Sequence, residues 1–186
     1  MKVLLVVDMQ YDFINGALGS EEAQAIVPNV IEKIKECAAD NRYAIVYTRD
    51  THYPDYMESN EGKHLPVPHC VSKTLGWEIH DHVSAASDGA TYVERLNKYS
   101  FGMEDIGRML ATIPEIANGL FDNTDVESIE IVGLCTDICV VSNALILKAA
   151  FPEIPMTVYG DCCAGTSVDA HEAALKVMQM CQIEVR

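Results

Sequence analysis

The sequence is short of positive charge. Only 13 of its 186 residues are Lys or Arg, against 28 Asp or Glu, and the formal net charge is -15. Nucleic acids and anionic membrane surfaces attract clustered positive charge, so we expect neither as a partner. No apolar run is long enough to span a bilayer, and the first residues lack the pattern of a secretory signal. We therefore expect a cytoplasmic protein.

Paired cysteine motifs are also absent. The seven cysteines are an odd number, and no two of them have C-x-x-C spacing. This argues against a structural zinc site built from thiolates and, in a reducing compartment, against a disulfide framework. No G-x-G-x-x-G loop follows the first apolar run, which disfavours a flavin or redox protein of the doubly wound class.

Apolar runs typical of buried strands alternate with helical patterns along the chain. Strands are expected at residues 2–8, 43–50, 91–98, 129–133 and 156–161, with a short closing strand at 182–186. Helices are expected at 20–41, 137–150 and 168–181, and two shorter helical patterns within 103–125 are separated at Pro114. This alternation predicts an α/β fold, a three-layer α/β/α sandwich around a mostly parallel, roughly six-stranded sheet. With no repeat or linker, residues 1–186 are expected to form a single domain.

Three chemically reactive side chains come at or just after the ends of predicted strands. Asp8 ends the first strand, Lys98 ends the third, and Cys139 follows the strand that ends at Gly133. Open α/β sheets bind ligands at the carboxyl ends of their strands, so these groups could share one site. If Asp137 opens the next helix, Cys139 lies in its first turn, where the helix dipole favours a thiolate. Taken singly, each residue also has a structural interpretation, as a loop cap, an exposed cation or a small buried thiol.

Residues 51–70 form a segment rich in Pro, Gly and polar groups, which predicts a loop. Together with Asp50 it holds several potential ligands for a borderline divalent metal such as Zn²⁺, Fe²⁺ or Mn²⁺. These are Asp50, His52, Glu61, His64 and His69. Histidines scattered in a surface loop are common without a metal, so the spacing alone leaves both interpretations open.

Six short motifs, in this order, resemble those of the isochorismatase-like superfamily of cysteine hydrolases, and most of all its nicotinamidase branch. They are VVDMQYDF (6–13), TRDTH (48–52), LPVPHC (65–70), NKYSFG (97–102), GLCTDICV (133–140) and YGDCCAG (159–165). The resemblance extends over essentially the whole chain.

The resemblance implies roles for particular residues. Asp8, Lys98 and Cys139 match the catalytic triad, and the backbone N–H groups of Cys135 and Cys139 match the oxyanion hole. Asp50, His52 and His69 match the metal ligands, and Glu61 matches an additional carboxylate ligand of some members. Phe13, Phe101 and Leu134 match residues of the substrate pocket. The family also has a cis peptide at the position of Leu134–Cys135.

The function that the resemblance implies is hydrolysis of nicotinamide to nicotinate and ammonia through a cysteine thioester. The resemblance also implies one bound divalent metal ion, for which zinc is expected ahead of iron or manganese. It implies a dimer or tetramer. The alternatives are another hydrolase of the superfamily, acting on carbamoyl amides, ureido acids or isochorismate, and a non-catalytic binding module. The ligand set Asp50, His52 and His69 argues against another hydrolase of the superfamily, because the branches that act on these other substrates generally lack the metal. A complete triad argues against the second.

Overall fold

The structure is a computed structural model that describes residues 1–111 and 126–186. Its described residues form one six-stranded sheet in which every pairing is parallel. In sequence order the strands are β1 (Lys2–Val7), β2 (Tyr43–Asp50), β3 (Tyr92–Lys98), β4 (Ser128–Leu134), β5 (Met156–Ala164) and β6 (Glu184–Val185). Their order across the sheet is β3-β2-β1-β4-β5-β6.

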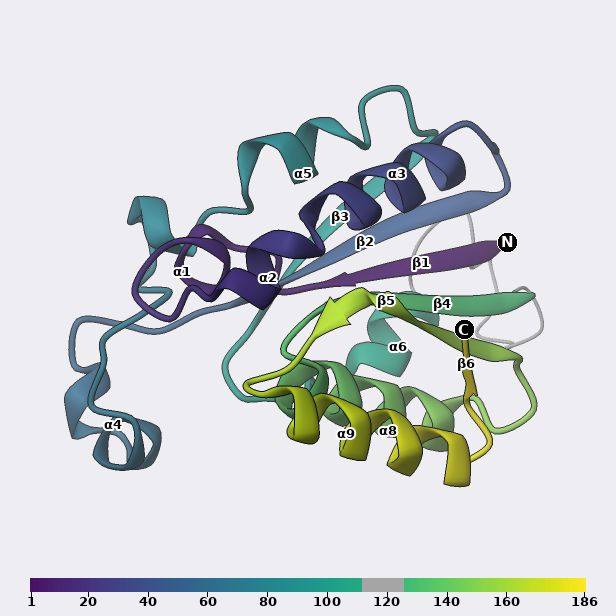
Figure 1. Cartoon of the computed structure of the whole chain (residues 1–186). Helices are drawn as coiled ribbons and strands as arrows, with labels where there is room; N and C mark the ends of the chain where they lie inside the picture. The colour runs from purple at the N-terminus through teal and green to yellow at the C-terminus, as the bar shows by residue number, and fades with distance from the viewer. Residues whose placement is uncertain (112–125) are drawn as a thin grey trace.

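Helices cover both faces of this sheet (Figure 1). On one face lie α2 (Glu21–Ala25), α3 (Val27–Ala38) and α5 (Asp81–Ala85), and on the other α6 (Ile106–Ala111), α8 (Val141–Ala150) and α9 (Val168–Met180). Alternate residues of β1 divide between two cores, because strand side chains point to opposite faces in turn. Leu5 packs with the core under α8, and Leu4 with the core under α3. The predicted three-layer α/β/α sandwich is confirmed.

The strand order reverses between β1 and β4, which places the switch point of the sheet at the ends of these two strands. Chains leaving neighbouring strands in opposite directions open a crevice there. Gly133 in β4 has a φ of +123°, and a Cβ at this position would collide with the carbonyl oxygen of Val7 in β1. A side chain at residue 133 would therefore push the two strands apart at the crevice.

Several element boundaries differ from the sequence expectation. The helix expected at 20–41 is two helices, α2 and α3, which meet at Ile26, and Pro28 lies in the first turn of α3. Strand β5 continues past Asp161 to Ala164, because a register shift opposite β4 keeps the strand paired where a loop was expected. The second helical pattern after Pro114 lies outside the described residues.

The segment expected to be a loop at 51–70 contains two short helices, the 3-10 turn η1 (Tyr56–Glu58) and α4 (Asn60–His64). Ser59 caps α4 by accepting a hydrogen bond from the N–H of Gly62. The short helix α1 (Tyr11–Ile14) and the turn η2 (Leu75–Trp77) pack against each other. Both α1 and α4 lie beyond the carboxyl ends of the strands (Figure 1). These added elements build walls around the switch point.

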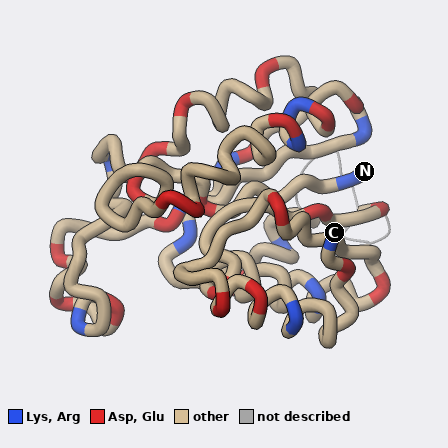
Figure 2. The backbone as a smooth tube through the Cα atoms, viewed as in Figure 1, with Lys and Arg blue, Asp and Glu red and all other residues tan. Residues whose placement is uncertain are grey.

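Acidic side chains are distributed along the whole backbone and outnumber the basic ones (Figure 2). Within the part of the chain that the structure describes, every helix is too short or too polar to cross a membrane.

A buried ion pair ties α3 to the sheet, away from the switch point. Lys33 Nζ lies 2.7 Å from Glu130 Oε2 and donates to the Tyr159 hydroxyl, while the Tyr43 hydroxyl donates to Glu130 Oε1. Lys33 and Glu130 keep only 9% and 12% of their side-chain surface exposed. Each charge therefore depends on the other for compensation.

We expect Lys33→Met to lower the free energy of unfolding by about 3–5 kcal/mol, because it leaves the Glu130 carboxylate buried without its cation. Urea denaturation measures this. The matched control is Glu36→Gln, which removes the exposed carboxylate on the same lysine and should change stability by no more than about 0.5 kcal/mol. Equal losses in the two variants would contradict the assignment of the stability to the Lys33–Glu130 pair.

Candidate active site

The structure brings Asp8, Lys98 and Cys139 together at the switch point. Lys98 Nζ lies 2.7 Å from Asp8 Oδ2 and 3.4 Å from Cys139 Sγ. It also donates to Asp50 Oδ1 at 3.0 Å, because Asp50 and Lys98 are partners in the register of β2 and β3. All of these side chains are buried, and Lys98 is only 1% exposed. The lysine therefore points into the protein at this site and does not extend to solvent.

The charges around Cys139 favour a neutral thiol. Burial and the neighbouring Asp8 carboxylate raise the pKa of Cys139 well above its ordinary value, and Lys98 opposes this only in part. The reason is that one ammonium already faces two carboxylates, Asp8 and Asp50, so ionising the sulfur adds a second uncompensated negative charge. The helix dipole, which on its own would favour a thiolate, is thus outweighed, and the thiol is the favoured form in the protein alone.

The same balance governs Asp8 and Lys98. Burial raises the pKa of Asp8 above its ordinary value, with Lys98 opposing. Burial on its own would lower the pKa of Lys98, but the negative charges of Asp8 and Asp50 raise it well above its ordinary value. Lys98 is therefore a fixed cation. Asp8 is the more basic of the two carboxylates beside it, because the pKa of Asp50 is lowered, against the effect of burial, with help from the histidines next to Asp50.

Asp8 has an unusual backbone conformation that aims its side chain. Its φ is +48°, in the left-handed region that residues other than glycine rarely adopt. The Thr48 hydroxyl accepts a hydrogen bond from the Asp8 N–H and donates to Asp8 Oδ1 at 2.7 Å. Such conformations persist only where neighbouring groups hold them, and they gather at functional sites. Thr48 on β2 is thus part of what positions the carboxylate.

Cys139 lies in a π-helical turn, Thr136–Val140, between β4 and α8. The peptide between Leu134 and Cys135 is cis, as the family resemblance implied. Asp137 lies in the first turn of this helix, with Cys135 at the N-cap, and its carboxylate accepts two hydrogen bonds from Thr166, from the N–H at 2.8 Å and the hydroxyl at 2.6 Å. The thiol-bearing turn is therefore fastened to the loop that follows β5.

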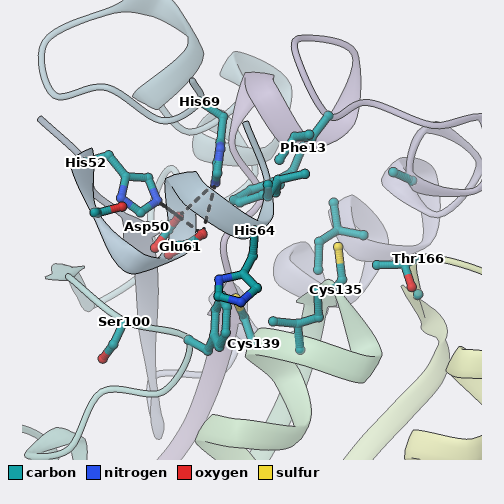
Figure 3. Close-up of a pocket in the computed structure, with 18 of the residues that line it drawn as sticks. Phe13, Asp50, His52, Glu61, His64, His69, Ser100, Cys135, Cys139 and Thr166 are labelled. Carbon is teal, nitrogen blue, oxygen red and sulfur yellow. Dashed lines mark ion pairs between the residues drawn. The ribbon is translucent and has the colours of Figure 1, made fainter. Parts of the chain in front are cut away.

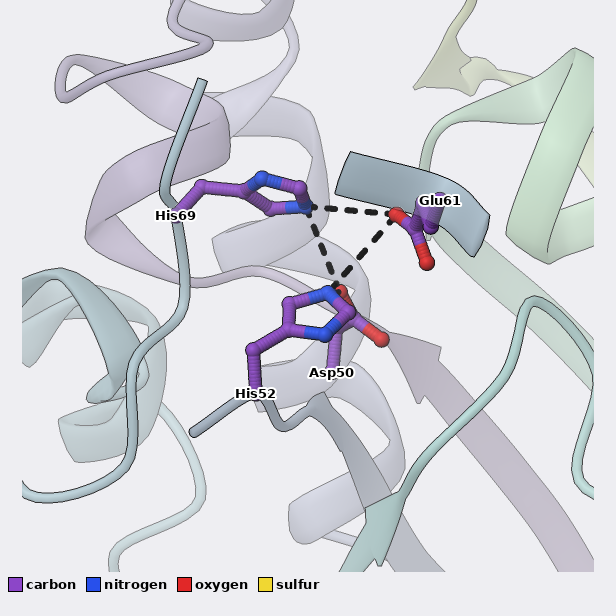
Figure 4. A group of neighbouring side chains, drawn as sticks. All are labelled: Asp50, His52, Glu61 and His69. Atoms are coloured by element: carbon purple, nitrogen blue, oxygen red, sulfur yellow. Dashed lines mark ion pairs between the residues drawn. The ribbon is translucent and has the colours of Figure 1, made fainter. Parts of the chain in front are cut away.

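A second cluster lies beside the three buried groups and consists of two imidazoles and two carboxylates (Figure 4). Ligand atoms of Asp50, His52, Glu61 and His69 all lie within 4.8 Å of one another. Three segments supply them. Asp50 and His52 lie at and just after the end of β2, Glu61 lies in helix α4, and His69 immediately precedes Cys70. Asp50 belongs to both groups, because Oδ1 faces Lys98 and Oδ2 faces the imidazoles.

The chemistry of this donor set fits a divalent metal ion. His69 Nδ1 lies 2.8 Å from the Val67 carbonyl oxygen, to which it can only donate, so Nε2 carries the lone pair that faces the cluster. His52 Nε2 is buried, and although it lies 2.8 Å from Asp50 Oδ2, the geometry is not that of a hydrogen bond. Two imidazole nitrogens with two carboxylate oxygens suit zinc, iron or manganese. Of the five loop candidates, His64 lies outside the cluster.

Two buried polar residues that the sequence analysis missed hold this arrangement together. Gln10 exchanges hydrogen bonds with the backbone of Asp50, accepting from its N–H at 2.7 Å and donating to its carbonyl at 2.9 Å. Asn143 donates to the carbonyl oxygens of Cys139 and Phe101 and accepts from the N–H of Met103. In the sequence, each of the two is a polar residue inside an apolar stretch, Gln10 just after β1 and Asn143 in α8. Such a residue indicates a structural role only once its hydrogen-bond partners are known.

A cavity of about 870 Å³ opens over both groups (Figure 3). Its walls include the three pocket residues implied by the resemblance, Phe13, Leu134 and Phe101, together with the thiols of Cys135 and Cys139. Burial raises the pKa of Cys135 to about 12, so this second thiol is also neutral at physiological pH. The arrangement as a whole offers a buried thiol and a candidate metal centre on one cavity, with a fixed cation beside the thiol and a proton acceptor beside that cation.

Comparisons with known proteins agree with this geometry. The family model of the Isochorismatase domain matches residues 2–186. A nicotinamidase/pyrazinamidase from Mycobacterium tuberculosis is 27% identical over 198 residues, covering 100% of this chain and 98% of the relative. The structure of a pyrazinamidase from Pyrococcus horikoshii in complex with zinc has a TM-score of 0.75 at 27% identity, covering 100% of this chain and 98% of that one. An N-carbamoylsarcosine amidase from Thermoplasma acidophilum shares the fold, with a TM-score of 0.71, 24% identity and coverage of 100% and 95%.

Proposed function

Because the chain belongs to the isochorismatase domain family and is a hydrolase, we propose that it is a nicotinamidase, a single hydrolase domain that converts nicotinamide to nicotinate and ammonia. The observation that carries the proposal is the contact of one buried lysine with both a carboxylate, at 2.7 Å, and a thiol, at 3.4 Å, beside a cluster of metal-type ligands. Amide hydrolysis by a thiol needs a proton acceptor and a stabilised oxyanion, and this site can supply both.

The first half of the proposed reaction forms a thioester. Asp8 takes the proton from Cys139 Sγ, and the sulfur attacks the carbonyl carbon of the amide while the carbonyl oxygen becomes an oxyanion. The backbone N–H groups of Cys135 and Cys139 donate to this oxyanion. The tetrahedral intermediate then expels its nitrogen, which takes the proton from Asp8 and leaves as ammonia. The burial that raises the pKa of Asp8 makes it a better proton acceptor for this step.

The second half releases the acid. A water molecule gives a proton to Asp8 and attacks the thioester carbon. The carbon–sulfur bond then breaks, Asp8 returns the proton to the sulfur of Cys139, and the acid leaves as nicotinate after giving its carboxyl proton to solvent. Lys98 stays protonated throughout and stabilises the negative charge that develops first on sulfur and then near Asp8. Phe13, close to His69 with ring centroids 5.5 Å apart, would hold one face of the substrate ring.

Asp50, His52, Glu61 and His69 would hold one divalent ion, which we propose to be zinc. The ion would supply a Lewis acid for the ring nitrogen of the substrate. The donor set and the zinc complex of the Pyrococcus relative support this assignment. In a direct test, purified protein is assayed for ammonia release from nicotinamide, from pyrazinamide and from a carbamoyl amide, with and without a chelator. Turnover that the chelator abolishes supports the proposal, whereas chelator-insensitive turnover of carbamoyl amides alone would favour the other branch.

Asp137 is proposed as a positioning residue, because it ties the Cys139 turn to Thr166. We expect Asp137→Ala to lower kcat about tenfold with KM changed by no more than about twofold, since small misplacements of a nucleophile slow the chemical step. Asp137→Asn keeps an acceptor for the Thr166 N–H and should retain most of kcat. Steady-state kinetics on nicotinamide measures both, and an Asn variant as slow as the Ala variant, with an unchanged melting temperature, would contradict this role.

A further inference from the structure

The cavity is much larger than the substrate of the proposed reaction. Its volume of about 870 Å³ lies in the upper part of the ~300–1,000 Å³ that drug-sized ligands occupy. Nicotinamide is one pyridine ring with one carboxamide. The thiol and the metal-type ligands fix its place at the buried end, where Cys139 is 5% and His69 2% exposed. Much of the remaining volume would hold only water if nicotinamide were the largest substrate.

The exposed apolar part of the cavity lining, which we call the outer cavity, consists of Leu65, Tyr99 and Phe101. These large side chains are 38%, 61% and 49% exposed, although they face a concave surface. The Tyr99 ring stacks on that of Tyr53, with centroids 6.1 Å apart and ring planes 10° apart, which holds it in one orientation. A ligand that covered them would remove apolar surface from water, which is the main source of affinity in such pockets.

One polar group in the outer cavity is without a partner on its inward side. His64, at the end of α4, lines the cavity, and Figure 3 shows its ring projecting into it. Its Nδ1 lies 2.8 Å from the Asn60 carbonyl oxygen and donates to it, so Nε2 is left as an acceptor with no hydrogen-bond partner among the described residues. A broad apolar surface with one oriented polar atom is the composition of a ligand site.

We propose that the outer cavity is a subsite for a second ring, so that the substrates of this enzyme include heteroaromatic primary carboxamides larger than nicotinamide. The inference rests on the proposed amide hydrolysis at Cys139. It adds that an apolar extension on the heteroaromatic ring lies against Leu65 and Tyr99, while His64 Nε2 accepts a hydrogen bond from any hydroxyl or N–H that the extension carries.

The test compares two substrates in three proteins. The probe is nicotinamide carrying a phenyl group at the second ring carbon that is meta to the nitrogen, and the reference is nicotinamide itself. In the unmodified protein kcat/KM for the probe should equal or exceed that for nicotinamide. Leu65→Ala should lower kcat/KM for the probe about tenfold, mainly through KM, and leave that for nicotinamide unchanged to within about twofold. Met57→Ala, an exposed apolar residue of the same segment that does not line the cavity, should change neither.

The outcomes separate the subsite from the reaction. If nicotinamide is hydrolysed and the probe is not, or if Leu65→Ala affects both substrates equally, the subsite is refuted and the proposed reaction stands. If the probe is hydrolysed with the expected sensitivity to Leu65 and nicotinamide is not, the subsite stands and nicotinamide is the wrong substrate. If neither amide releases ammonia, both are refuted.

Discussion

Cys139→Ala is expected to lower the rate of ammonia release from nicotinamide by about three orders of magnitude or more, because no other group in the site can form the thioester. Cys135, the other thiol on the cavity, precedes the turn that carries Cys139, whereas Cys139 Sγ lies 3.4 Å from Lys98 Nζ. The measurement is kcat from a coupled ammonia assay. Cys139→Ser should lose nearly as much, since a hydroxyl is a far weaker acid than a thiol and Asp8 cannot deprotonate it as readily.

The control for this prediction is Cys135→Ala, which also shortens a thiol on the same cavity. Its kcat should stay within about tenfold of the unmodified value, because the backbone N–H of Cys135, and not its sulfur, is assigned to the oxyanion. Both alanine variants should unfold at nearly the unmodified temperature, since each removes a single sulfur atom from the core. A Cys139→Ala protein with ordinary kcat would end the assignment of the nucleophile.

His69→Ala is expected to abolish metal binding, from about one divalent ion per chain to almost none, and with it to lower nicotinamide turnover by about two orders of magnitude or more. The cluster has four ligands, and His69 is 2% exposed with Nδ1 fixed on the Val67 carbonyl, so its loss removes one of only two imidazoles from the cluster. Elemental analysis of the purified protein gives the metal content independently of activity.

The matched control is His82→Ala, which removes an imidazole from α5 outside the cluster and should leave both the metal content and the turnover unchanged. Asp50 is unsuitable for this test, because its carboxylate also contacts Lys98 Nζ and its loss would disturb the catalytic groups directly. A metal-free protein that hydrolyses nicotinamide at the full rate would contradict the proposed role of the cluster.

The architecture and the meeting of the three reactive groups were accessible from the sequence because both depend on strand ends. In a parallel sheet, residues that follow strands share one edge, so Asp8, Asp50 and Lys98 were expected on the same side. The sequence pattern does not determine how neighbouring strands align with one another in the sheet. The pairing of Asp50 with Lys98 depends on the register of β2 and β3, and that register is set by tertiary packing.

The protonation state of Cys139 and the size of the cavity were inaccessible for a different reason. The sequence argument counted Lys98 and a helix N-terminus in favour of a thiolate, but it could not count the second carboxylate, Asp50, that shares the same ammonium. Likewise, residues 51–70 resemble a loop because the segment is rich in Pro, Gly and polar groups. Helix α4 forms there only as one wall of the cavity, with Ser59 as its cap.

The most direct test of the account is to find the acyl group. Protein mixed with nicotinamide is quenched in acid within its first turnover and digested, and its peptides are analysed by mass spectrometry. The account predicts a nicotinoyl adduct on the sulfur of Cys139 that disappears as nicotinate is released. Ammonia release at the normal rate without any adduct, or with the adduct on Cys135 instead, would contradict it.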